Sequence, residues 1–125
     1  DRMDIIPVFG DVVSYIERGH DELIFPAMRV MLRFSFWCIH MADTETRKPL
    51  VQGLHRFFRK LPARYFRVLR RESRRQFSRK DAVQYALLST ALRWKLCSLL
   101  FYDYLWQESC EELVKKALRA KDRTA

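Results

Sequence analysis

Residues 54–80 read LHRFFRKLPARYFRVLRRESRRQFSRK, and the net charge of this 125-residue chain is concentrated in them. Eleven Lys and Arg residues stand against a single acid, Glu72, so the segment carries a formal charge of +10 while all other residues sum to −1. Charge concentrated in this way attracts an anionic partner and speeds encounter with it. The segment is therefore predicted to be a binding surface.

The same segment indicates the fold class. Pro62 separates two stretches of helix-forming residues, and after it Phe66, Leu69 and Phe77 are spaced so that they share one narrow face while arginines cover the rest. The whole chain has only three Gly and four Pro, with 49% hydrophobic and 31% charged residues. We predict an all-α fold in a single globular domain.

Helix boundaries are predicted from proline, glycine and capping residues. Pro7 favours an extended start over residues 4–10, after which Asp11 is expected to cap a first helix that Gly19 ends. Asp21 is expected to cap a second helix. The apolar residues of that helix cover more than one face, which predicts burial on two sides, between its own domain and another molecule.

The later boundaries follow from the same signals. Residues 42–47 are polar and are predicted to form a loop, in which Thr44 or Thr46 is available to cap a third helix with Pro49 in its first turn. Asp81 is expected to cap the last long helix, and Glu–Lys pairs four residues apart predict a solvated helix after it. The expected long helices cover residues 11–18, 21–41, 48–60, 63–77 and 82–106.

No apolar run reaches the roughly 18 to 20 residues that a membrane span needs. The two best candidates, residues 24–42 and 82–106, are both interrupted by charged side chains. We therefore expect no transmembrane span.

Residues suited to catalysis or metal binding are not clustered in the sequence. The three histidines stand in separate segments, and the three glycines form no phosphate-binding loop. The three cysteines, at positions 38, 97 and 110, lack metal-ligand spacing, which favours reduced thiols. We expect a protein that is not an enzyme and has no metal or cofactor of its own.

Residues of the basic segment and of the helix after it resemble those of a known family, the LYR-motif (complex 1 LYR-like) family of small mitochondrial helical proteins. In that family a Leu-Tyr-Arg triplet is followed by a basic helix that ends in Phe, and a third helix often starts at Asp-Pro. The likeness covers residues 51–99, with His55 in place of the Tyr and Ala82 in place of the Pro. The residues that carry it are Leu54, His55, Arg56, Lys60, Arg70, Arg74, Phe77 and Asp81.

A second register of the motif is also present. In it Ala27, Met28 and Arg29 stand for the triplet, and Phe58 with Arg59 for the downstream Phe-Arg. The first register is preferred because a suitable third helix follows it.

The resemblance implies an antiparallel three-helix bundle with extra N-terminal helices. The N-terminal helical extension would cover residues 1–47, the LYR-like bundle residues 48–107, and a solvated C-terminal helix and tail residues 108–125.

The resemblance also implies a function. Members are non-catalytic adaptors in the mitochondrial matrix or on the matrix side of the inner membrane, where they are accessory subunits or assembly factors of respiratory complexes, complex I first among them. They bind an acidic acyl carrier protein, whose acyl-phosphopantetheine would need an apolar slot such as Phe58, Phe66 and Phe77 could line. A surplus of exposed aromatic residues predicts other subunits as further partners; it comprises Trp37, Trp94, Tyr102, Tyr104 and Trp106.

Planar guanidinium groups suit the carboxylates of such a carrier protein. For Phe66, Leu69 and Phe77, an ordinary core position is favoured over a dedicated contact with the acyl chain. For His55, an ordinary surface position is at least as well supported as a role in the motif. The partner-binding residues that the resemblance implies are Leu54, His55, Arg56, Lys60, Arg70, Arg71, Arg74, Arg75, Phe77 and Arg79.

An alternative reading is a helical RNA-binding subunit of a mitochondrial ribosome. Arginines interleaved with Phe57, Phe58, Tyr65 and Phe66 would neutralise phosphates and stack on unpaired bases. The sequence carries no RNA-binding signature.

Overall fold

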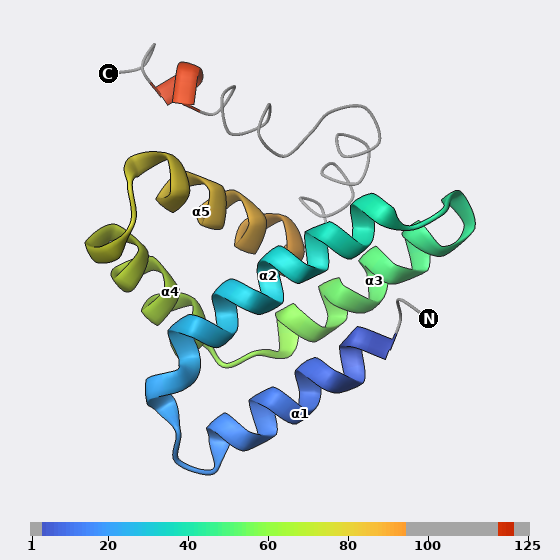
Figure 1. Cartoon of the computed structure of the whole chain (residues 1–125), viewed down its shortest axis with the longest axis horizontal. Helices are drawn as coiled ribbons and strands as arrows, with labels where there is room; N and C mark the ends of the chain where they lie inside the picture. Colours follow the sequence, from blue (N-terminus) through green and yellow to red (C-terminus); the bar gives the residue numbers. More distant parts are fainter. Residues whose placement is uncertain (1–3, 95–117, 122–125) are drawn as a thin grey trace.

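The computed structural model describes residues 4–94 and 118–121, and these are arranged as helices joined by short connections (Figure 1). The predicted all-α class is confirmed. In chain order the elements are α1 (Ile5–Glu17), the 3-10 turn η2 (Asp21–Leu23), α2 (Ile24–Met41), α3 (Thr44–Lys60), α4 (Ala63–Gln76) and α5 (Arg79–Arg93).

Helix α2 is the centre of the fold. It packs against α1, α3, α4 and α5, and Figure 1 shows it crossing the middle of the molecule between them. Its residues Met28 and Leu32 are completely buried. Other helices of the same chain therefore bury most of the wide apolar surface of α2, although Val30 and Phe34 stay exposed.

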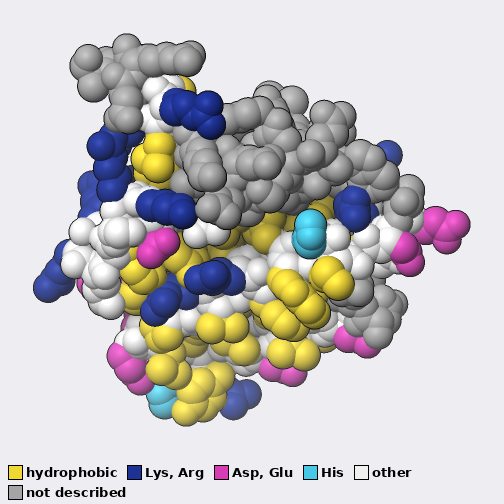
Figure 2. All heavy atoms as spheres, turned by 45° about the horizontal axis from the view of Figure 1, so that its top comes forward, with side chains coloured by type: hydrophobic (Ala, Val, Ile, Leu, Met, Phe, Trp, Pro, Cys, Tyr) yellow, Lys and Arg dark blue, Asp and Glu magenta, His cyan; other side chains and the backbone are white. Residues whose placement is uncertain are grey.

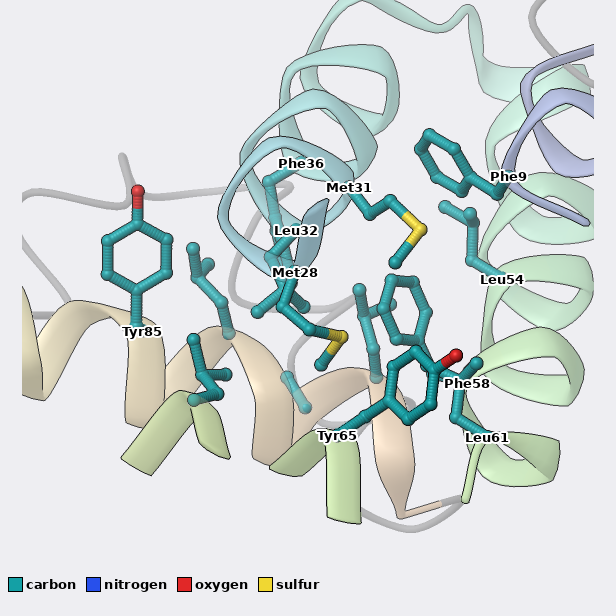
Figure 3. Packing of buried hydrophobic residues seen from close by; sticks show 14 of the residues in the cluster. Phe9, Met28, Met31, Leu32, Phe36, Leu54, Phe58, Leu61, Tyr65 and Tyr85 are labelled. Atoms are coloured by element: carbon teal, nitrogen blue, oxygen red, sulfur yellow. The ribbon is translucent and has the colours of Figure 1, made fainter. Parts of the chain in front are cut away.

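A single cluster of buried side chains joins all five α-helices. Figure 3 shows Phe9 of α1, Met31 of α2 and Leu54 and Phe58 of α3 pointing toward one another. Helix α5 packs against both α3 and α4. Helices α3 and α4 themselves point in different directions (Figure 1). The predicted break at Pro62 lies between them and is confirmed. The first 47 residues thus supply part of the same core.

The predicted extended start over residues 4–10 is wrong. Helix α1 begins at Ile5 and passes through Pro7, so Asp11 lies inside the helix and does not cap it. Pro7 is the third helical residue, where the missing amide hydrogen would have had no partner within the helix. The predicted stop at Gly19 is confirmed, because this glycine has a φ of 110°, in the left-handed region that glycine adopts readily.

The predicted loop at residues 42–47 is also shorter than expected. Asp43 caps α3 by accepting a 2.7 Å hydrogen bond from the Thr46 amide, so the helix starts at Thr44 and Pro49 lies beyond its first turn.

Arg47 fixes this corner. Its Nε donates to the Ile39 carbonyl oxygen at 3.0 Å and its Nη2 to that of Ala42 at 2.8 Å. These carbonyls are at the end of α2, where helical partners run out; the Ile39 oxygen also accepts from the Ala42 amide at 3.3 Å.

The last described helix also differs from the prediction. Ser78, and not Asp81, is its N-cap, because the Ser78 hydroxyl accepts the Asp81 amide hydrogen at 3.3 Å. The helix ends at Arg93, since the backbone of Trp94 is extended. Of the predicted solvated C-terminal segment, residues 118–121 are described; they are helical, and residues 119–121 are exposed. The predicted continuation to residue 106, the rest of that segment and the cysteines at positions 97 and 110 lie outside the described residues.

Residues Asp21–Met41 form a helical segment that is long and apolar enough to cross a membrane. Half of the window that meets this test is buried inside the molecule, and the central helix of a packed core has the same character. Length and composition alone therefore do not tell whether this segment is a membrane span or a buried core helix.

Candidate anion-binding surface

Two of the predicted partner-binding residues belong to the core. Leu54 has no exposed surface and His55 is 7% exposed. The His55 Nδ1 lies 3.0 Å from the carbonyl oxygen of Leu92, which ties α3 to the end of α5. Both side chains are buried, so the surface position considered for His55 is wrong, and the binding role of the two residues stays a prediction.

Arg56 and Lys60 are exposed on α3, but they lie apart from the other predicted residues. They line a shallow hollow of about 450 Å³ with Pro7 of α1 and Phe57. This hollow shares no lining residue with the surface of α4.

The burial pattern of α4 decides which way its arginines point. Tyr65, Phe66, Leu69 and Ser73 are buried, and their spacing of three to four residues places them on one side of the helix. The arginines are left on the outside. We call the five that line a hollow of about 360 Å³ along this outer side the arginine face; it consists of Arg67, Arg70, Arg71, Arg74 and Arg75.

Arg64, at the start of α4, is fully engaged within the chain. Its Nη2 lies 2.5 Å from Glu17 Oε2 and its Nε 3.4 Å from Asp21 Oδ2. Asp21 therefore pairs with α4 and does not cap α2. The Tyr65 hydroxyl donates to Glu17 Oε1 at 3.0 Å, and hydrogen bonds from Arg64 and Tyr65 lower the pKa of Glu17. Burial, followed by the bond to Glu17, raises the pKa of Tyr65 to about 12.

Arg71 and Arg75 share the one carboxylate of α4. Glu72 Oε1 lies 3.3 Å from Arg71 Nε and 3.6 Å from Arg75 Nη1. Gln76 donates to Glu72 Oε2 at 2.8 Å. This bond, followed by the contacts with the two arginines, lowers the pKa of Glu72. Part of the charge of Arg71 and Arg75 is therefore balanced locally.

Arg67, Arg70 and Arg74 have no such partner. Within residues 4–94 and 118–121, none of the three forms an ion pair with a carboxylate, and all three side chains are exposed. Like charges held this close repel one another. An external anion would therefore stabilise these three arginines more than the arginines that already have a carboxylate partner.

A groove of about 710 Å³ runs between α4 and α5, directly beside the arginine face. Apolar side chains line it, with Leu69 at 3% exposure and Phe66 at 6%. Arg70 and Arg74 border the groove as well as the arginine face. The other cations that line it are Arg79, Arg93 and Lys121, and Figure 2 shows Lys and Arg side chains gathered along this side of the molecule.

Phe77 links the groove to α2. It is the C-cap of α4, and its ring centroid lies 5.1 Å from that of Tyr85 on α5 and 5.4 Å from that of Phe25 on α2. The guanidinium of Arg29 lies over the same ring at 4.7 Å. The structure thus brings four of the ten predicted partner-binding residues together around one groove; they are Arg70, Arg74, Phe77 and Arg79.

The aromatic residues expected to bind RNA or an acyl chain lie mostly in the core. Phe58 and Tyr65 have no exposed surface, Phe66 is 6% exposed, and Phe57 is half-buried. Of the three residues expected in an acyl slot, Phe66 and Phe77 line the groove and Phe58 does not. Of the four rings expected to stack on unpaired bases, only that of Phe57 is therefore partly accessible.

Sequence reasoning missed several residues of this surface. Arg67 lies three and four residues before Arg70 and Arg71, so helical periodicity was a sufficient signal for it. Ser73 and Tyr85 line the groove, but only the packing of α4 against α5 shows this.

The described residues contain no group of three or more His, Cys, Asp or Glu side chains that could hold a metal ion. Cys38 is a buried free thiol. Comparisons with protein family models, with curated proteins and with solved structures find no match to this chain.

Proposed function

We propose that this protein is a non-catalytic adaptor of the LYR type that binds an acidic acyl carrier protein through the arginine face and the adjoining groove. In this proposal the protein is an accessory subunit or assembly factor of a mitochondrial respiratory complex, with complex I as the first candidate. The resemblance of residues 51–99 to the LYR-motif family supports the assignment, and a LYR-like bundle within residues 48–107 is part of it.

The observation that carries the proposal is the position of Arg70 and Arg74. Both are exposed and unpaired within the described chain, and both border an apolar groove. An acidic helix presents carboxylates three and four residues apart, about 5 to 6 Å between neighbours. Arginines at positions 67, 70, 71, 74 and 75 repeat at the same intervals, so two such helices are complementary in charge and spacing.

The groove supplies the second element that a carrier protein requires. Its apolar walls would take the acyl chain of a phosphopantetheine arm, while Arg79 or Arg93 would meet the phosphate. This is the only cofactor that the proposal involves, and it belongs to the carrier.

An apolar surface on the other side of α2 supports residence in a larger assembly. Val8 of α1 and Val30 and Phe34 of α2 line a hollow of about 390 Å³, with exposures of 57%, 65% and 43%. Figure 2 shows apolar side chains gathered over α1 and α2. Of the predicted exposed aromatics, Trp37 and Trp94 are 54% and 57% exposed, and the other three lie outside the described residues.

The adaptor reading is tested by binding of the purified full chain to acyl carrier protein that carries no acyl group, a short one or a long one, over a range of salt concentrations. We expect affinity to fall with salt and to rise with acyl length. The contradicting result is binding to RNA with no binding to any of the three carriers, where the logarithm of the affinity falls linearly with the logarithm of the salt concentration. That result would favour the RNA-binding alternative over the adaptor.

A further inference from the structure

Three buried polar groups around Phe77 have no hydrogen-bond partner. They are Arg29 Nε of α2, Ser73 Oγ of α4 and Tyr85 Oη of α5. Arg29 and Tyr85 both contact the Phe77 ring, and the Phe77 amide donates to the Ser73 carbonyl at 3.0 Å. In the described part of the chain only one other buried side-chain atom, His55 Nε2, is unpaired.

This concentration of unpaired groups is unusual. Buried polar atoms in folded proteins almost always have a partner, and each exception requires an explanation. Ser73 is 4% exposed and Tyr85 is 2% exposed, so bulk water does not satisfy their hydroxyls. Ser73 and Tyr85 thus bring two unpaired hydroxyls to the lining of the groove, while Arg29 lies over the Phe77 ring and outside that lining.

All three groups share one chemical property: each can donate a hydrogen bond. A guanidinium only donates and carries a positive charge, and the hydroxyls of Ser and Tyr donate as well as accept. In the groove, where Arg70 and Arg74 add positive charge beside the hydroxyls of Ser73 and Tyr85, the ligand that suits such donors is an oxyanion, such as a carboxylate or a phosphate monoester, and hydrogen bonds to charged oxygens are the stronger kind.

The surroundings decide what the oxyanion is attached to. Ser73, Phe77 and Tyr85 line the α4/α5 groove, whose walls include the apolar Leu69 and Val83. Figure 3 shows the Tyr85 ring at the edge of the core cluster, apart from the side chains around Met28 and Tyr65. A ligand in this groove has an oxyanion at one end and an apolar body along the rest.

We propose that the groove binds a free single-chain amphiphile with an oxyanion head. The head accepts hydrogen bonds from the hydroxyls of Ser73 and Tyr85, and the chain lies along Phe66 and Leu69. This mode places the charged end inward, beside Phe77, whereas the arm of a carrier protein would keep its phosphate at the arginine rim. The proposal rests on the groove described above and does not require that a carrier protein binds.

The test is a titration of the purified full chain with dodecanoate, dodecyl phosphate and dodecanol, read by calorimetry and by the shift in melting temperature. Both anions are expected to bind and to raise the melting temperature, and the tighter one identifies the head as carboxylate or phosphate. Dodecanol, which has the same chain without the charge, is expected to bind at least tenfold more weakly.

Two variants locate the head. Tyr85→Phe and Ser73→Ala each remove one hydroxyl and should weaken anion binding about tenfold or more. Neither should lower the melting temperature of the free protein, because no hydrogen bond within the chain is lost. The matched controls are Tyr65→Phe and Ser35→Ala, whose hydroxyls donate to Glu17 and Met31. They should lower the melting temperature and leave anion binding unchanged.

Two results would overturn the inference. One is parental affinity for both anions in Tyr85→Phe and Ser73→Ala, which would place the head at the arginine rim. The other is the absence of any binding of either anion by the parent chain. A chain that binds the amphiphiles but no carrier protein would contradict the adaptor function and leave this inference standing.

Discussion

The two ends of α4 use the same residue type for different purposes. At the start of the helix, Arg64 pairs with Glu17 and Asp21, and the neighbouring Tyr65 is buried and bonded to Glu17. Two and three turns further on, Arg70 and Arg74 are exposed and have no carboxylate partner among the described residues. The first end fastens α4 to α1, and the second is left for another molecule.

This difference shows how a basic helix should be interpreted. A count of charges treats all six arginines of α4 as equal, yet the structure separates them by whether the chain itself supplies an anion. The arginines without an anion from the chain are those at which an external anionic partner contributes most binding free energy, because their positive charges repel one another while unbalanced.

The largest expected difference between the two ends is in stability. Tyr65→Ala removes a completely buried ring and should lower the free energy of unfolding by about 3 to 5 kcal/mol. Arg74→Ala changes an exposed side chain and should stay within about 0.5 kcal/mol. Denaturant unfolding of both variants measures the contrast, and equal losses would show that the C-terminal end of α4 is also structural.

A smaller effect is expected from Arg64→Ala. The ion pair with Glu17 is partly exposed, so its loss should lower the free energy of unfolding by about 0.2 to 1 kcal/mol. Affinity for an acyl carrier protein should not change, because Arg64 lines neither the groove nor the arginine face. Weaker carrier binding in this variant would extend the partner surface to the start of the helix.

A further effect appears only at alkaline pH. The pKa of Tyr65 is about 12 in the folded protein and about 10 in an unfolded chain. The phenol therefore contributes stability in full below pH 10, and this contribution is lost as pH rises toward 12. The free energy of unfolding of Tyr65→Phe, measured between pH 9 and 12, should fall less steeply than that of the parent; identical slopes would contradict the buried contact with Glu17.

Much of the fold could be predicted from local signals. Gly19 ends α1 because glycine readily adopts the positive φ found there, and Pro62 ends α3 because it disfavours helical backbone before it and has no amide hydrogen. The all-α class followed from composition. Pro7 was misread because proline is tolerated in the first turn of a helix, where its missing amide hydrogen has no partner, and the sequence alone did not place the start of α1 two residues before it. The central position of α2 depends on tertiary packing, which local patterns suggest only through its wide apolar surface.

The candidate site was predictable in charge and less so in detail. The +10 segment indicated a basic surface, but the three-letter motif placed Leu54 and His55 on it, although Leu50, Leu54 and Phe58 repeat every four residues as one buried row. The groove could not be foreseen, because Ser73 and Tyr85 meet only through the packing of α4 on α5.

The central claim is that Arg70 and Arg74 bind the acidic partner because of where they lie, and not through net charge alone. It is tested most directly by comparing two charge-reversal pairs in a binding titration with acyl carrier protein: Arg70→Glu with Arg74→Glu, and Arg71→Glu with Arg75→Glu. Both pairs change the net charge of the same helix by the same amount. Loss of detectable binding in the first pair, with measurable binding retained in the second, is the result predicted here; equal loss in both pairs, or none in the first, would contradict it.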